Sequence, residues 1–86
     1  MKSVSMYTLS TYPWCRKSKS YFTEHKVPFT FVDYDLADEA TQSRISAEVD
    51  AAGATGFPYV RIDNEVIAGY QPERYAKALG IPGGTT

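Results

Sequence analysis

The sequence has 86 residues, of which 43% are hydrophobic and 14% aromatic, and its formal net charge is -1. This length suits one domain, and the aromatic content is too high for a disordered chain. The near-neutral charge argues against a broad nucleic-acid-binding face, which needs clustered basic residues. Neither a signal-peptide core nor a membrane span is visible. We therefore expect a protein without a nucleic-acid or membrane partner.

The first third of the chain predicts a strand, a helix and a second strand. Residues 4–9 are rich in side chains that favour strands. Pro13 suits the first position of a helix, because its missing N–H is not needed there, and Pro28 closes that helix. Residues 29–34 alternate large apolar with smaller or polar side chains, which predicts a strand.

The rest of the chain predicts a helix, a hairpin and a last helix. Asp38 is expected to cap a helix that ends at Gly53. Residues 59–62 and 65–68 flank two residues that tolerate turn conformations, so they predict a β-hairpin. Pro72 opens the last helix. The order β-α-β-α-β-β-α predicts an α/β fold with a mixed four-stranded sheet and three helices, formed by residues 1–80, with a flexible tail at 81–86.

Cys15 is the only cysteine, and its position alone leaves two alternatives open. In the first turn of a helix that begins at Pro13, the helix dipole and the basic residues that follow favour a reactive thiolate. Cys15 also shares a stripe with Ser18 and Phe22 that packs on the sheet, and a buried thiol is inert. We expect burial beneath Tyr12 and Trp14 to prevail, because desolvation outweighs an exposed dipole contact.

His25 is the only histidine, and it lies on the same predicted helix as Cys15, ten residues away. A straight helix keeps these two side chains apart, so they cannot form a catalytic pair. We expect His25 to cap the end of the helix. One cysteine and one histidine cannot make a structural zinc site either, so no metal is expected and any chemistry is sulfur chemistry.

The segment "TGFPYV" places Pro58 directly before a predicted strand. Proline has no backbone N–H to donate to the hydrogen bonds of a sheet. Pro58 is either a plain proline at a strand start or part of a cis Phe57–Pro58 bond. A cis bond would turn the backbone of Phe57 outward. An outward N–H and C=O could pair with an extended peptide or with glutathione.

Four segments occur in a characteristic order: "YTLSTYPWCRKSKSYF", "VPFTFVDYDL", "GATGFPYV" and "VIAGYQPE". Together they make the chain similar to the glutaredoxins of the thioredoxin-fold superfamily. The resemblance implies that the first strand is internal to the sheet, with the first and third helices on one face and the second on the other. In the family the third segment holds a cis-proline, so with the position of Pro58 we predict that the Phe57–Pro58 bond is cis.

In the family the first segment carries C-P-[YFW]-C. The resemblance therefore implies that Cys15 matches the second, resolving cysteine and that Tyr12 replaces the first, nucleophilic one. It makes Cys15 the catalytic candidate. It also implies a substrate-binding set, which consists of Tyr12, Pro13, Trp14, Phe57, Pro58, Gly69 and Tyr70. Within this set an exposed apolar patch is expected, formed by Pro13, Trp14, Phe57, Pro58 and Tyr70.

Two departures from the family bear on glutathione. Leu9 stands where many glutaredoxins have a lysine for a glutathione carboxylate, and "AGYQPE" lacks the acidic residues of the family's last motif. That segment looks more like the S-G-F-x-P-[DE] of glutaredoxin-like redoxins, which thioredoxin reductase recharges. Expected partners are therefore a disulfide-containing protein or glutathione as co-substrate, with no bound cofactor, and thioredoxin reductase as a possible donor.

The function implied by the resemblance is that of a thiol-disulfide oxidoreductase in electron transfer and redox homeostasis, expected as a cytoplasmic monomer. Because a phenol forms no disulfide, a second hypothesis is a catalytically inactive module that binds a thiol peptide or protein. A third is that Tyr12 is an artefact of the clone or a sequence error in an ordinary enzyme, since one nucleotide separates Tyr and Cys codons.

Overall fold

The computed structural model describes residues 2–81. Of the tail expected at 81–86, only Ile81 falls inside this range, and it packs against the hydrophobic core. The rest of that tail lies outside the described residues.

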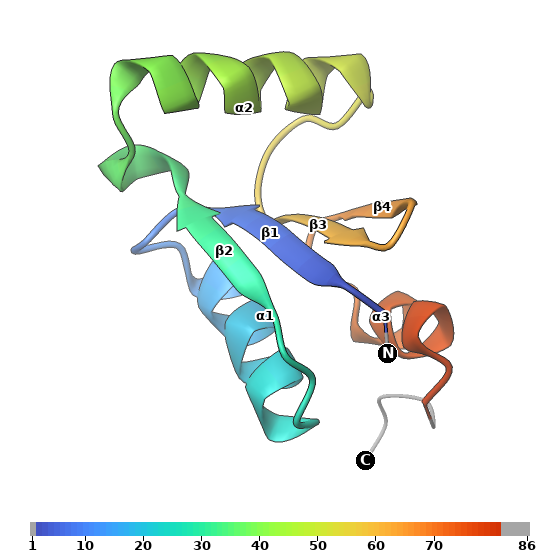
Figure 1. Cartoon of the computed structure of the whole chain (residues 1–86). Coiled ribbons are helices and arrows are strands. Elements are labelled where there is room, and N and C mark those ends of the chain that lie inside the picture. Colours follow the sequence, from blue (N-terminus) through green and yellow to red (C-terminus); the bar gives the residue numbers. More distant parts are fainter. Residues whose placement is uncertain (1, 82–86) are drawn as a thin grey trace.

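The described chain contains four strands and three α-helices in the predicted order, with one short 3-10 helix (η1) after the second strand (Figure 1). Their bounds are β1 Val4–Thr8, α1 Pro13–Glu24, β2 Thr30–Asp33, η1 Tyr34–Leu36, α2 Glu39–Ala51, β3 Tyr59–Ile62, β4 Glu65–Ala68 and α3 Pro72–Leu79. The predicted α/β class and element order are confirmed.

The four strands form one mixed sheet in the order β2-β1-β3-β4, so the first strand is internal, as predicted. β1 runs parallel to β2, because α1 carries the chain back to the start of the sheet between them. β3 pairs antiparallel with β1 and forms a hairpin with β4. The C-terminal end of β1 and the N-terminal end of β3 therefore meet near the start of α1.

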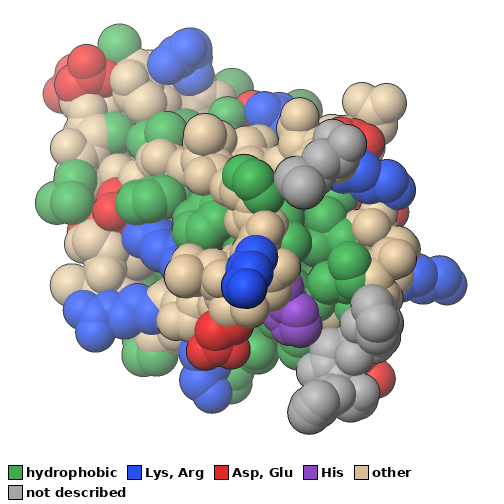
Figure 2. Space-filling view, turned by 60° about the horizontal axis from the view of Figure 1, so that its bottom comes forward, with side chains coloured by type: hydrophobic (Ala, Val, Ile, Leu, Met, Phe, Trp, Pro, Cys, Tyr) green, Lys and Arg blue, Asp and Glu red, His purple; other side chains and the backbone are tan. Residues whose placement is uncertain are grey.

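Helices cover both faces of the sheet: α1 and α3 lie on one face and α2 on the other (Figure 1). The alternation of β1 explains the two cores, since Met6 faces the first core and Tyr7 packs against the second. Phe22 and Tyr75 anchor the first core, and Ile45 the second. Figure 2, which views the α1 and α3 side, shows hydrophobic side chains near the middle of that face, with charged side chains among and around them.

The structure corrects the second predicted strand. β2 is four residues long, and the chain turns into η1 at Tyr34 instead of continuing the strand. Asp35 explains this turn, because its carboxylate accepts hydrogen bonds from the N–H (2.8 Å) and hydroxyl (2.5 Å) of Ser10. β2 is an edge strand, and both Phe31 and Val32 are exposed. The alternation of large apolar and smaller side chains in this strand therefore does not correspond to one buried and one exposed face.

Asp38 caps α2 as predicted, because its side chain accepts a hydrogen bond from the Thr41 N–H at 2.8 Å. His25 is the C-cap residue of α1, also as predicted, and its ring packs on Tyr21 with 4.3 Å between ring centroids. No helix within residues 2–81 is both long and apolar enough to span a membrane.

Candidate functional site

The site begins at the turn between β1 and α1. Tyr12 is the N-cap residue of α1, and its N–H donates to the Leu9 carbonyl at 3.2 Å. Its own carbonyl accepts from the Cys15 N–H at 3.1 Å. Because Tyr12 precedes the first helical turn, its side chain remains 39% exposed.

The opposite wall comes from the loop before β3 and the connection after β4. The Phe57–Pro58 bond is cis, as predicted. The Pro58 carbonyl accepts a hydrogen bond of 2.7 Å from the Gly69 N–H, which joins the two segments. Within residues 2–81, the segment 55–57 makes no backbone hydrogen bond, so its N–H and C=O groups are available to another chain.

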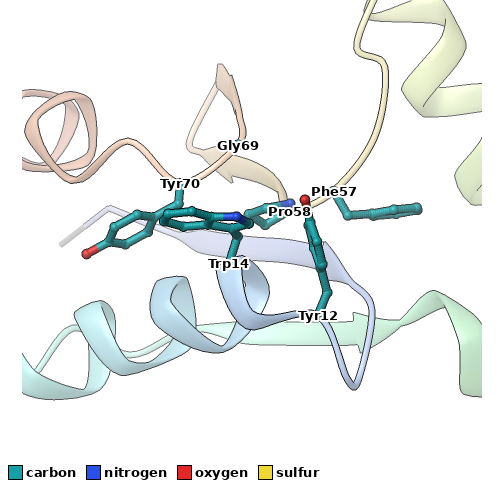
Figure 3. A pocket seen from close by; sticks show the side chains of 6 residues that line it. All are labelled: Tyr12, Trp14, Phe57, Pro58, Gly69 and Tyr70. Atoms are coloured by element: carbon teal, nitrogen blue, oxygen red, sulfur yellow. The ribbon is translucent and has the colours of Figure 1, made fainter.

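These segments enclose a cavity of about 270 Å³, called here the aromatic cavity (Figure 3). It is lined by Tyr12, Trp14, Phe57, Pro58, Gly69 and Tyr70. Six of the seven predicted binding residues therefore lie together. Pro13 is exposed at the first position of α1 and is not part of the lining. No charged side chain of the described residues lines this cavity.

One part of the predicted apolar patch is wrong, because Pro58 is fully buried. The connection from β4 to α3 lies beside it, held by the hydrogen bond from Gly69. Of the other patch residues, Pro13 and Trp14 are exposed, Trp14 by 46%, whereas Phe57 and Tyr70 are half-buried.

Two side chains contact the ring of Trp14. Its ring stacks on Tyr70 with 5.9 Å between centroids and an interplanar angle of 29°. The amino group of Lys17 lies 4.9 Å from the centre of the Trp14 ring, within cation–π distance. The Trp14 ring lies beside Tyr70 in the lining of the cavity (Figure 3).

Tyr75 stabilises the site through hydrogen bonds made by its buried hydroxyl, and the sequence did not predict this role. Its hydroxyl donates to the Gly69 carbonyl at 2.5 Å and lies 3.0 Å from the hydroxyl of Ser18. Both side chains are fully buried, and burial raises the pKa of Tyr75 to about 12. The only sequence signals were an apolar stripe on each helix, which cannot show that Ser18 and Tyr75 meet.

Cys15 lies beneath this site and is fully buried, so the burial alternative is confirmed. The Leu9 N–H donates to its sulfur at 3.3 Å. Desolvation raises the pKa of the thiol above its usual value, opposed by the Leu9 hydrogen bond and by the charge of Lys19. Cys15 is not part of the cavity lining. Exposed aromatic groups and a buried sulfur thus occupy one helical turn.

The described residues, 2–81, contain no group of three or more His, Cys, Asp or Glu side chains that could hold a metal ion. The polar groups in and beneath the site are the thiol of Cys15, the indole of Trp14, the unpaired backbone groups of residues 55–57 and three phenols. The phenols belong to Tyr12, Tyr70 and Tyr75.

Comparisons with known proteins show similarity to the glutaredoxins. Residues 4–67 match the family model of the glutaredoxins. An uncharacterized glutaredoxin-like 8.6 kDa protein in the rubredoxin operon of Clostridium pasteurianum is 26% identical over 76 residues, covering 88% of this chain and 96% of that protein. Among solved structures, the glutaredoxin from Methanosarcina mazei Go1 is 31% identical with a TM-score of 0.83, covering 92% of this chain and 79% of that one. The Methanosarcina acetivorans methanoredoxin is also 31% identical, with a TM-score of 0.80 and coverage of 92% and 85%.

Proposed function

This chain belongs to the glutaredoxin family, and from that premise we propose that it carries out slow thiol–disulfide exchange with disulfide-containing proteins. Cys15, its only cysteine, is the sulfur nucleophile. The observation that carries the proposal is the uncharged aromatic cavity beside a backbone segment, residues 55–57, that is free to pair with an extended chain. The same six lining residues then form the substrate-binding surface.

The exchange follows ordinary thiol chemistry. The Cys15 thiolate attacks one sulfur of a docked disulfide, a new S–S bond forms, and the other substrate sulfur leaves as a thiolate that takes up a proton. A small thiol such as glutathione, acting as co-substrate, then attacks the mixed disulfide. It forms an S–S bond with the substrate sulfur and releases the Cys15 thiolate. Thioredoxin reductase is the alternative electron donor.

The uncharged lining supports a protein substrate over glutathione as the docked group. Glutathione carries two carboxylates at neutral pH, and no cationic side chain lines the aromatic cavity. Leu9 supplies no positive charge either, because its side chain is apolar. Its described contacts at the site are made by its backbone carbonyl and N–H. A single thiol working with small-molecule thiols suits a monomer in a reducing compartment such as the cytoplasm.

The second candidate function is a binding module without catalysis, and Tyr12 specifically favours it. The side chain at the exposed N-cap position is a phenol, which cannot form a disulfide, and the one sulfur is fully buried. Docking through the aromatic cavity needs neither group to react.

A disulfide-reduction assay with glutathione or with thioredoxin reductase distinguishes the two functions. We expect slow turnover for the wild type, none for Cys15→Ser, and turnover at least about a hundredfold faster for Tyr12→Cys. The reason is that Tyr12→Cys places an exposed thiol at the helix N-terminus, where the dipole stabilises the thiolate. Tyr12→Ser is the matched control, since it removes the phenol without adding sulfur.

Equal rates for the wild type and Cys15→Ser would reject catalysis by Cys15 and leave the binding module. If Tyr12→Cys is inactive as well, the scaffold itself does not support the exchange.

A further inference from the structure

A second cavity lies next to the aromatic cavity and shares Phe57 with it. This α2 cavity has a volume of about 450 Å³ and lies among α2, η1 and the loop before β3. The ring of Phe57 projects away from Trp14 (Figure 3) and packs 5.3 Å from the ring of Tyr34, which lines the α2 cavity. Phe57 therefore forms the wall between the two cavities.

The two cavities differ in charge. Within residues 2–81, Asp50 is the only charged side chain that lines the α2 cavity, and it is exposed to solvent. The C-terminal end of α2 at Ala51 adds the partial negative charge of a helix dipole. The α2 cavity thus favours a cationic group, whereas the aromatic cavity favours an uncharged apolar or aromatic one.

The backbone between the cavities can align a ligand across both. Residues 55–57 have no backbone hydrogen bond within the described chain, so an extended peptide can pair with them. Side chains two residues apart in such a peptide lie on the same side, about 7 Å from each other. One peptide can therefore present an aromatic and a basic side chain to neighbouring cavities.

We propose that the partner of this site is an extended protein segment that places an apolar or aromatic side chain in the aromatic cavity and a lysine or arginine in the α2 cavity against Asp50. This inference rests on the docking of a protein segment at the aromatic cavity, which the proposed function requires, and it names the chemical class of that segment. It predicts that an anionic peptide, including glutathione, binds more weakly than a cationic one.

The test uses Trp14, the only tryptophan of the chain, as a fluorescent reporter inside the aromatic cavity. The probes are three blocked pentapeptides with the sequence Ala-Phe-Ser-X-Ala, in which X is arginine, glutamine or glutamate, and glutathione is a fourth probe. For the wild type at low salt we expect the arginine peptide to bind about fivefold tighter than the glutamine peptide, and the glutamate peptide and glutathione to bind more weakly still. An ion pair at a solvent-exposed site supports a difference of that size.

Asp50→Asn should bring the arginine and glutamine peptides to within twofold of each other, and Asp50→Lys should reverse the order of the arginine and glutamate peptides. Glu39→Gln is the matched control, because it removes one exposed negative charge from the first turn of the same helix. It should leave the ratios unchanged.

Equal affinities for the three peptides would overturn the charge assignment while leaving docking at the aromatic cavity intact. A loss of preference in Glu39→Gln equal to that in Asp50→Asn would also overturn it, since net charge would then explain the effect. If no peptide changes the fluorescence of Trp14, both the docking function and this inference fail.

Discussion

At the scale of single residues, positions 12 and 15 have opposite environments although one helical turn separates them. Tyr12 is the N-cap and extends from the start of the helix, whereas Cys15 belongs to the buried stripe of α1 with Ser18 and Phe22. A sulfur at position 12 would be exposed at the positive end of the helix dipole, and a sulfur at position 15 is not. We therefore expect a thiol at position 12 to react much faster than the thiol of Cys15.

We expect Cys15 of the native protein to react with iodoacetamide at pH 7 at least about a hundredfold more slowly than in the protein unfolded by urea. Burial denies access to the reagent, and the raised pKa leaves little thiolate. The rate is measured by mass spectrometry of the alkylated protein. Labelling as fast in the native as in the unfolded protein would show that the first turn of α1 opens readily.

At the scale of elements, α3 positions the site through one side chain and ends at a specific residue. Tyr75 joins α3 to Ser18 of α1 and to the Gly69 carbonyl, so the wall of the aromatic cavity depends on the placement of this helix. The helix stops at Gly80, which has a φ of 71° in the left-handed region. A side chain is disfavoured in that conformation, which makes glycine the suitable residue.

Gly80→Ala should lower the free energy of unfolding by about 1 kcal/mol without changing the fold, because a Cβ is strained at positive φ although no atom crowds it. Urea unfolding followed by circular dichroism measures the change. Gly56→Ala is the control: this residue does not lie at positive φ and has open space around it, so stability should stay within about 0.5 kcal/mol. Equal effects of the two substitutions would refute the capping role of Gly80.

At the scale of the whole molecule, the core is rich in tyrosines that hold their protons. Burial raises the pKa of four of them above the ordinary value of 10.0, and a hydrogen bond to Glu48 contributes at Tyr7. The four are Tyr7, Tyr21, Tyr59 and Tyr75. The folded chain therefore binds protons more tightly than the unfolded chain at alkaline pH, which lowers its stability there.

We expect the free energy of unfolding to be nearly constant around neutral pH and to fall as the pH rises through 10 towards 12. Unfolded tyrosines lose their protons near pH 10, while Tyr75 in the folded state keeps its proton to about pH 12. Urea unfolding at pH 7, 9 and 10.5 measures the slope. Tyr75→Phe should make this slope shallower, even though it loses the hydrogen bonds to Ser18 and Gly69. An unchanged slope in that variant would assign the alkaline loss to other groups.

The sequence by itself determined the features that depend on neighbouring residues. The element order, the hairpin of β3 and β4 and the Asp38 cap follow from contiguous patterns of apolar, turn and capping residues, so they could be predicted. The clustering of the six cavity residues was predicted too, because the family resemblance links their segments.

The tertiary structure alone decided what depends on residues distant in the chain. Ser18 and Tyr75 are 57 positions apart, and no local pattern shows that their hydroxyl groups meet. The burial of Pro58 depends likewise on the distant Gly69, and the turn after β2 depends on Ser10, which precedes α1. The separate α2 cavity with Asp50 exists because η1, α2 and the loop before β3 enclose it from different parts of the sequence. Periodicity reports which face of an element is buried, but only packing decides which side chains share a contact.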